Sequence, residues 1–134
     1  MPKHRRGSRS ARLPGRHREF PQLVQRALAG IPPPFADVLR EVAIVIEDEP
    51  TPYQRQENEL AADETLYGLY EGVPRTEYGA DFALVPNRIS LFRLPLEADF
   101  PDPRDLEDEV RLTVIHEIAH HMGIDDDRLD ELGY

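Results

Sequence analysis

The stretch "DPRDLEDEVRLTVIHEIAHHMG", residues 102–123, carries the strongest helical pattern in this chain of 134 residues. Asp102 is a favourable N-cap, Pro103 follows at the first helical position, and Asp105 adds a charge that suits the helix dipole. Gly123 has no Cβ and can adopt the left-handed conformation that ends a helix. The stretch therefore predicts one long helix that stops at Gly123.

Apolar side chains occupy a broad arc of this predicted helix and must be buried. They are Val110, Leu112, Val114, Ile115, Ile118, Ala119 and Met122. At 100° per residue the remaining sector holds Glu109, Thr113, His116 and His120. A mostly buried helix thus directs one narrow polar stripe to a single side.

Two histidines of the stripe have the spacing of metal ligands. His116 and His120 are four positions apart, about 40° around the helix, so both imidazoles point the same way. Such a pair can bind Zn²⁺ at roughly 2.0 to 2.1 Å. Glu117 lies about 100° away, a poor position for a ligand but the position of a general base that acts on water at the metal. The competing interpretation is a histidine-rich helix end that binds no metal.

A third ligand is expected after the helix. Gly123 lets the chain turn back, and Asp126 follows three residues later. A carboxylate oxygen binds zinc at about 2.0 to 2.2 Å, which leaves a fourth position for water. From the residues alone, Asp125 and Asp127 compete with Asp126 for this role. His121 points away from the histidine pair and is expected at the surface or in a hydrogen bond.

The stretch "HEIAHHMGIDD", residues 116–126, resembles the His-Glu-x-x-His-x-x-Gly-x-x-Asp signature of one branch of the zincin metallopeptidases. The small size of the chain and its ending "DDDRLDELGY" are most similar to the minimal zincins, short bacterial zincin-like metallopeptidases. The resemblance implies an α+β fold, in which a small mixed β-sheet packs on a backing helix and a zinc-binding active-site helix.

The resemblance also implies a function. It assigns Zn²⁺ to His116, His120 and Asp126, and it makes Glu117 the general base in hydrolysis of a peptide or unfolded-protein substrate. The strand expected at residues 88–94 would hold an extended peptide by edge pairing. The methionine-containing turn of metzincins is absent, because the two methionines are residues 1 and 122.

Two tyrosines are candidate hydroxyl donors to an oxyanion, Tyr78 and Tyr134, although packing is the plainer role for both. The alternative function is a non-catalytic, zinc-stabilised interaction module. Such a module needs the three ligands but not Glu117, and it would lose stability on chelation.

Charge divides the chain into two parts. Residues 1–18 contain seven of the 16 basic residues and no acidic residue, which leaves nine basic against 26 acidic residues, a difference of −17, from position 19 onward. The basic arm, residues 1–18, is expected to be disordered, and residues 19–134 to form the metallopeptidase domain. The arm is expected to be a solubilising tail or to lie on the acidic body, and contact with nucleic acid or another polyanion is the alternative.

The composition argues against several classes of protein. The chain contains no cysteine, which excludes disulfides, thiolate ligands and a cysteine nucleophile. No run of about 18 apolar residues predicts a membrane helix. The arm has no apolar signal region, and Gly7, Pro14 and Gly15 disfavour an amphipathic targeting helix. A cytoplasmic protein is therefore expected.

Periodicity predicts the remaining elements. Residues 19–31 and 32–42 are expected to contain helices, and 42–50 a buried strand that ends at Pro50. Residues 50–64 are expected to be a loop, and 65–72 a second strand.

Overall fold

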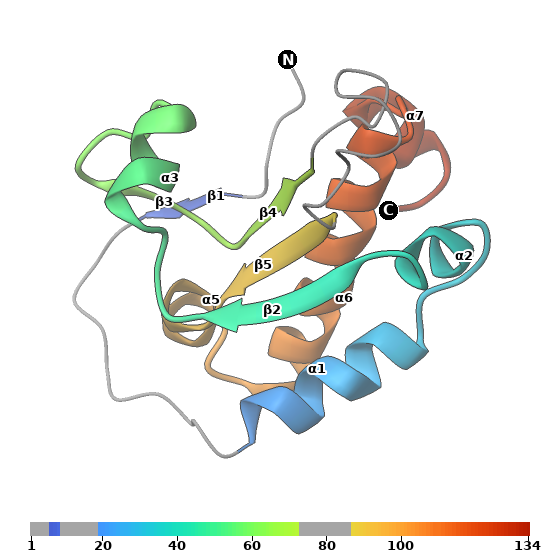
Figure 1. The fold of residues 1–134 in the computed structure, drawn as a ribbon. Helices are drawn as coiled ribbons and strands as arrows, with labels where there is room; N and C mark the ends of the chain where they lie inside the picture. The colour runs from blue at the N-terminus through green and yellow to red at the C-terminus, as the bar shows by residue number, and fades with distance from the viewer. Residues whose placement is uncertain (1–5, 9–18, 73–86) are drawn as a thin grey trace.

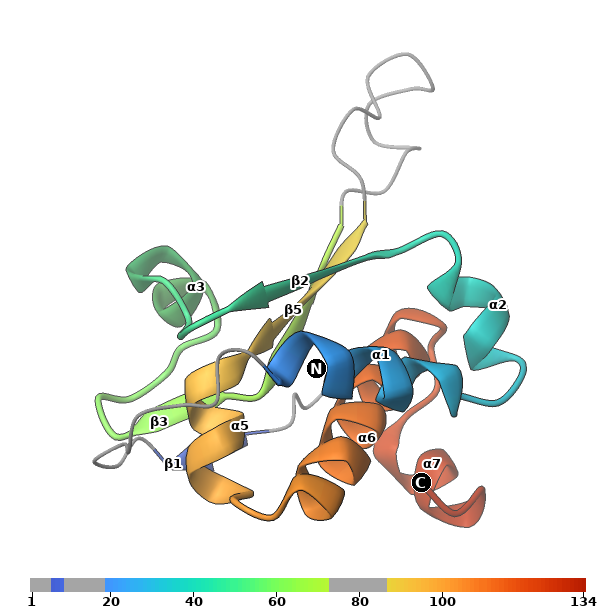
Figure 2. The same ribbon diagram turned by 90° about the horizontal axis from the view of Figure 1, so that it is seen from below.

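The structure is a computed structural model that describes residues 6–8, 19–72 and 87–134 (Figure 1). It has an α+β fold, as expected, with a small mixed sheet and most of the helices gathered on one face of that sheet (Figure 2). In the part of the chain that is described, no helix is long and apolar enough to cross a membrane.

The main sheet has three strands in the order β2-β5-β4. β2 (Ala43–Glu47) pairs in parallel with β5 (Arg88–Phe92), and β4 (Gly68–Glu71) pairs with β5 in the antiparallel direction. β5 is therefore the central strand. The expectation that residues 88–94 offer an edge to a peptide is wrong, because both edges of β5 are occupied.

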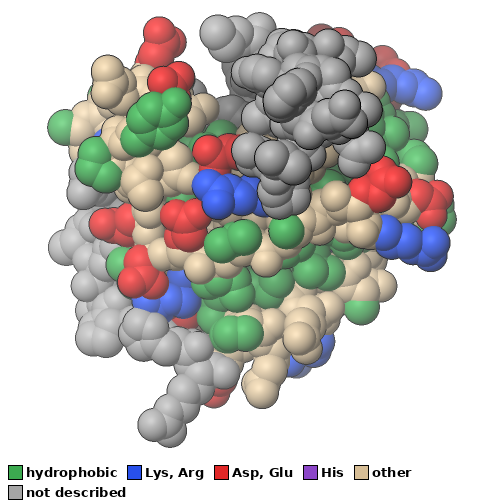
Figure 3. Space-filling view, viewed as in Figure 1, with side chains coloured by type: hydrophobic (Ala, Val, Ile, Leu, Met, Phe, Trp, Pro, Cys, Tyr) green, Lys and Arg blue, Asp and Glu red, His purple; other side chains and the backbone are tan. Residues whose placement is uncertain are grey.

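β2 lies at the edge of the sheet and is only partly covered. Its residues are either exposed or half-buried and none is fully buried, and Ile46 keeps 36% of its surface accessible. Figure 3 shows apolar side chains exposed on this face of the molecule. The prediction of a buried strand is thus wrong here: an apolar run indicates a strand, but the placement of helices over one face decides its burial.

Two predicted helices, α1 (Phe20–Ala29) and α2 (Phe35–Leu39), are confirmed. Each packs on the long helix α6 (Pro103–His121), and α6 also contacts β4 and β5. Their shared core includes Phe20, Leu23, Phe35, Ile89, Leu91, Val110, Val114 and Ile118. α1 is thus the backing helix, and α1 and α6 pack side by side on the same face of the sheet (Figure 2).

The predicted start and stop of α6 are confirmed. The Asp102 carboxylate accepts a hydrogen bond from the backbone N–H of Arg104 at 2.8 Å, and Pro103 begins the helix. Gly123 follows the end with φ +83°. Met122, however, is 39% exposed rather than buried, since it lies at the last turn, beyond the packed part of the helix.

Three short helices occupy segments where no helix was predicted. α3 (Pro52–Glu57) lies in the expected loop and begins with a capping box, in which Thr51 and Gln54 exchange side-chain and backbone hydrogen bonds. α5 (Arg93–Asp99) follows β5 directly, and α7 (Asp126–Glu131) follows α6. The signal Thr-x-x-Gln is that of a capping box and could have revealed α3.

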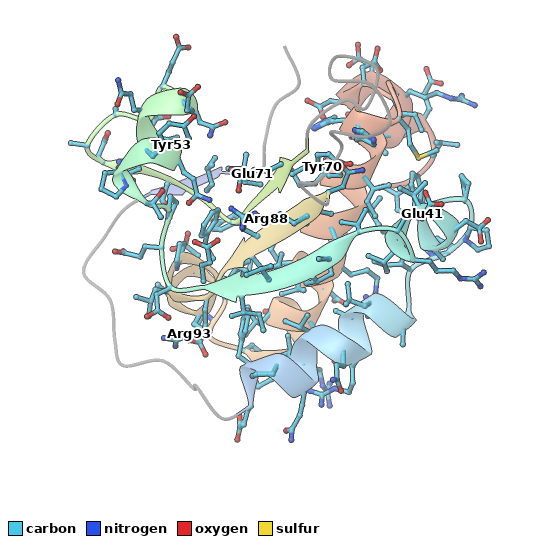
Figure 4. All side chains as sticks on the ribbon, viewed as in Figure 1. Glu41, Tyr53, Tyr70, Glu71, Arg88 and Arg93 are labelled. Atoms are coloured by element: carbon cyan, nitrogen blue, oxygen red, sulfur yellow. The ribbon has the colours of Figure 1, made fainter. Side chains whose placement is uncertain are left out.

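Arg93 explains part of the turn from β5 into α5. Its side chain is 4% exposed, and its guanidinium contacts Asp48 at 2.8 Å and Glu97 at 2.7 Å (Figure 4). A buried guanidinium needs such partners, because an unpaired buried charge is strongly destabilising. The predicted strand therefore ends at Phe92, and Arg93 begins a helix.

The segment predicted as one strand, residues 65–72, forms two. β3 (Glu64–Leu66) and β4 are separated by a bend at Tyr67. β3 pairs in the antiparallel direction with β1 (Arg6–Ser8). The expectation of a disordered arm is therefore wrong for residues 6–8, whose backbone joins a strand edge, while the other arm residues lie outside the described ranges. The boundary at residue 19 stays a prediction.

Candidate metal centre

The two histidines of the signature lie one turn apart on α6. Their ring centroids are 6.1 Å apart, and the ring planes are nearly perpendicular. The His116 residue is 8% exposed, and the His120 side chain 5%. Burial on a long helix fixed at both ends limits the rotamers of both imidazoles.

Asp126, the first residue of α7, meets both histidines. Its Oδ1 lies 2.8 Å from Nε2 of His120 and 3.9 Å from Nδ1 of His116. One ligand atom from each of the three residues lies within 4.8 Å of the others. The Asp126 side chain is 39% exposed, so the group is open to solvent on that side.

The donor set fits zinc. Four ligands at 2.0 to 2.2 Å in a tetrahedron are about 3.3 to 3.6 Å apart, and the two separations from Oδ1 of Asp126 to the histidines, 2.8 and 3.9 Å, lie on either side of this range. Two imidazoles and a carboxylate leave a fourth position for water or substrate. Nδ1 of His120 is buried and has no hydrogen-bond partner in the described part of the chain, so these residues do not supply the acceptor that usually supports a histidine ligand.

The turn after α6 brings Asp126 back to the helix. The N–H of Ile124 donates to the carbonyl oxygen of Ala119 at 2.8 Å, and Gly123 has the positive φ that this turn requires. The sequence prediction that Gly123 reverses the chain is confirmed.

The structure distinguishes the three aspartates that compete as third ligand. The carboxylate of Asp125 caps α7 and accepts the N–H of Arg128 at 2.8 Å. Asp127 is exposed and belongs to no described group of potential ligands. Asp126 alone of the three contacts the histidines.

We expect Gly123→Ala to lower the free energy of unfolding by about 1 to 2 kcal/mol, because an L-residue at φ +83° is strained. A Cβ there meets nothing within 4 Å, so the cost is conformational rather than steric. Gly133→Ala is the matched control, since Gly133 has φ +90° and equally open surroundings. Urea unfolding should show that both variants lose a similar amount of free energy of unfolding. In a competition titration, only Gly123→Ala should weaken zinc binding.

Glu117 accepts a hydrogen bond from a strand of the sheet. The side chain is buried, with 1% of the residue exposed, and its Oε1 accepts the backbone N–H of Tyr70 in β4 at 2.7 Å. Sequence reasoning placed Glu117 beside the histidines but missed Tyr70, which is 47 positions away. No local pattern could have indicated this contact.

β4 lies close to α6 because residue 68 is a glycine. A Cβ on Gly68 would meet Cγ2 of Thr113 at 2.6 Å. Thr113 is itself fixed, since its hydroxyl donates to Oε2 of the buried Glu109 at 3.1 Å. Two members of the predicted polar stripe, Glu109 and Thr113, are thus buried, and the close approach of β4 brings the N–H of Tyr70 to Glu117.

We expect Gly68→Ala to destabilise the protein by about 1 to 3 kcal/mol, because the new methyl group would force β4 away from α6. Thr113→Ser removes the clashing Cγ2 and keeps the hydroxyl. In the Thr113→Ser background, Gly68→Ala should therefore lower the free energy of unfolding much less. Urea unfolding of the two single variants and the double variant measures this coupling; a cost that is equal in both backgrounds would show that Thr113 is not the obstacle.

The ring of Tyr70 extends past Glu117 to the end of α6. It stacks on His121 with centroids 4.2 Å apart, and His121 is exposed, as expected. Burial raises the pKa of the Tyr70 hydroxyl, which is enclosed without a hydrogen-bond partner in the described part of the chain. The Tyr134 ring instead packs edge-on against Phe35, which supports the packing role, and Tyr78 lies outside the described residues.

A helix that carries His-Glu-x-x-His in an α+β fold is typical of metallopeptidases. A sequence profile described as zincin-like metallopeptidase matches residues 39–134. This match covers more than half of the sequence, and the chain belongs to the zincin-like metallopeptidase family. The resemblance carried by residues 116–126 is thereby confirmed. No curated protein matches the chain closely enough to count as a relative.

Proposed function

We propose that the protein is a zinc-dependent peptidase whose metal ligands are His116, His120 and Asp126. One observation carries the proposal: a buried glutamate of the signature, Glu117, is oriented by a strand beside a group of two histidines and an aspartate. Membership of the zincin-like metallopeptidase family supports it. A structural zinc site has no use for a buried carboxylate at this position.

Bound Zn²⁺ would polarise a peptide carbonyl and lower the pKa of water. The chain itself supplies the proton transfer. The carboxylate of Glu117 accepts a proton from the attacking water and delivers it to the nitrogen of the leaving amine. The N–H of Tyr70 fixes the carboxylate for this task at Oε1.

The substrate in this proposal is a peptide or an unfolded protein in an extended conformation. Because β5 is central, the strand edge available near Glu117 belongs to β4. Main-chain pairing with such an edge gives affinity without deep side-chain pockets. Cleavage of a diverse peptide library by zinc-loaded protein, abolished by a chelator and restored by zinc, is the test.

A second candidate is a zinc-stabilised interaction module. The observation in its favour is that the ligand group joins α6 to α7, so that a bound ion would fasten the C-terminal helix to the domain. This candidate requires a large fall in Tm on chelation together with no cleavage of any library peptide. Cleavage that depends on Glu117 would exclude it.

A further inference from the structure

The long helix α6 presents two neighbouring rows of side chains at the candidate metal centre. His116 and His120, four positions apart, form the row of candidate ligands. Glu117 and His121, also four positions apart, form a second row, since residues with this spacing are neighbours on one side of a helix. Both members of the second row contact Tyr70 in β4. A single residue of the sheet thus touches α6 at two points one turn apart.

Tyr70 makes these two contacts with different parts of the residue. Its backbone N–H donates to Oε1 of Glu117 at 2.7 Å. Its ring lies against the imidazole of His121, with the ring centroids 4.2 Å apart and the planes 22° from parallel. His121 is the last residue of α6, so the stack joins β4 to the end of that helix. The position of the N–H that binds Glu117 is therefore coupled to the position of the helix end.

Other contacts fix the start of β4 on α6 and hold its end in the sheet. Gly68, at the start of β4, lies against Thr113 of α6. Glu71, at the end of β4, accepts hydrogen bonds from Arg88 of β5 at 3.3 Å and from Gln54 of α3 at 3.1 Å (Figure 4). These bonds tie the end of β4 to β5 and α3, and neither of them reaches α6. Tyr70 therefore supplies contacts that join the end of β4 to α6.

The ring of Tyr70, and not its hydroxyl, makes the contact with His121. The ring extends over Gly72, where a Cβ would meet Cε1 of Tyr70 at 3.1 Å. The hydroxyl is enclosed and has no hydrogen-bond partner in the described part of the chain. A buried hydroxyl without a partner does not stabilise a fold, whereas two stacked flat rings do. The contact thus requires a flat ring at position 70 and another at position 121.

We propose that Tyr70 and His121 are positioning residues for Glu117, and that their stack keeps the N–H of Tyr70 on the Glu117 carboxylate. Without the stack, the end of β4 would move more freely on α6, and the carboxylate would lose the hydrogen bond that fixes its orientation. The stack itself stands on the geometry of these contacts. Its effect on hydrolysis rests on the proposed function, in which Glu117 is the general base.

His121→Leu and His121→Phe form a matched pair that tests the stack in the full chain. Both variants replace the imidazole by an apolar group, but only phenylalanine keeps a flat ring. Amide-resolved hydrogen exchange by NMR gives the protection factor of the Tyr70 amide. We expect it to fall at least about fivefold in His121→Leu and to stay within about twofold of the wild type in His121→Phe.

The amide of Leu69 is the internal control. Successive residues of an antiparallel strand direct their backbone groups to opposite sides, and the N–H of Tyr70 leaves the sheet for Glu117. The N–H of Leu69 therefore points toward β5. Its protection factor should be the same in the wild type and in both variants, which shows that the sheet is intact.

A second pair of variants separates the ring of Tyr70 from its hydroxyl. The protection factor at residue 70 should stay within about twofold in Tyr70→Phe and fall at least about fivefold in Tyr70→Leu. Equal protection in the wild type, Tyr70→Leu and His121→Leu would overturn the stack as the contact that holds the N–H. An equal fall in Tyr70→Phe and Tyr70→Leu would assign that contact to the hydroxyl and overturn the role of the ring.

Hydrolysis by the zinc-loaded protein tests the effect on Glu117. His121→Leu should lower kcat by about 5- to 50-fold, because a general base that is poorly oriented transfers a proton less well. KM should change less than about twofold, because Gly68 keeps the start of β4 on α6. His121→Phe should restore most of the rate, and the zinc content should be equal in all three proteins.

Two results distinguish the stack from the proposed function. An unchanged kcat in His121→Leu, in spite of a lower protection factor at Tyr70, would overturn the positioning role. Failure of the wild type and of every variant to cleave any peptide, with the changes in protection as expected, would count against the proposed enzyme and leave the stack established.

Discussion

Replacing Glu117 with glutamine is expected to lower the rate of peptide hydrolysis by about 10²- to 10⁴-fold, the usual contribution of a general acid–base group. Glutamine has nearly the same shape, and its amide oxygen can still accept the N–H of Tyr70, so the fold and the ligand group should be preserved. What disappears is the ability to accept a proton from water. Steady-state kinetics with a cleavable library peptide measures the rate.

The control variant is Glu107→Gln on the same helix. Glu107 is paired with Arg26 and Arg111 on the surface of α6, far from the signature in sequence. It should leave both hydrolysis and zinc content unchanged. Metal analysis must show that Glu117→Gln also retains zinc, since a variant that loses its metal reports on binding and not on proton transfer. Undiminished hydrolysis by zinc-loaded Glu117→Gln would falsify the proposed mechanism.

Asp126→Ala is expected to weaken zinc binding by more than the roughly 10- to 100-fold that a change outside the ligands costs. The substitution removes the carboxylate whose Oδ1 contacts both histidines and leaves two imidazoles as the remaining ligands. Mass spectrometry of the purified protein gives the metal content, and competition with a chromogenic chelator gives the affinity.

Asp127→Ala serves as the matched control for Asp126→Ala. Both residues lie in the first turn of α7, so both variants lose one favourable charge at the N-terminus of that helix. Asp127 is exposed and takes no part in the ligand group. If the two variants bound zinc equally well, the third ligand would have to be sought elsewhere.

Local sequence signals predicted α6 and its turn well. The cap at Asp102, the first-turn proline and Gly123 act within a few residues of the helix ends, and the structure confirms each. α5 had no comparable signal, because its N-cap, Phe92, makes no side-chain cap and Pro95 lies inside the helix. The sequence pattern therefore predicted a strand as far as residue 94, although Arg93 and Leu94 belong to α5.

Contacts between distant segments could not be predicted in the same way. The order β2-β5-β4 depends on how three strands and their helices pack, and apolar alternation in β5 is equally compatible with a central or an edge position. The signature placed Glu117 on α6, yet its hydrogen bond to Tyr70 depends on the close approach of β4 at Gly68. The motif therefore indicated the candidate ligands and the candidate general base, whereas the contact that orients Glu117 depends on tertiary structure.

The position of Asp126 on α7 has a consequence for how fast an ion can leave. α7 has six residues, and Leu129 is its one fully buried side chain. A helix this short can detach by local opening while α6 and the sheet remain folded. Release of zinc to a chelator should therefore proceed far faster than global unfolding, and Leu129→Ala should accelerate it further. The rate at which the ion is lost should thus depend on the local stability of the last nine residues and not on the stability of the whole domain.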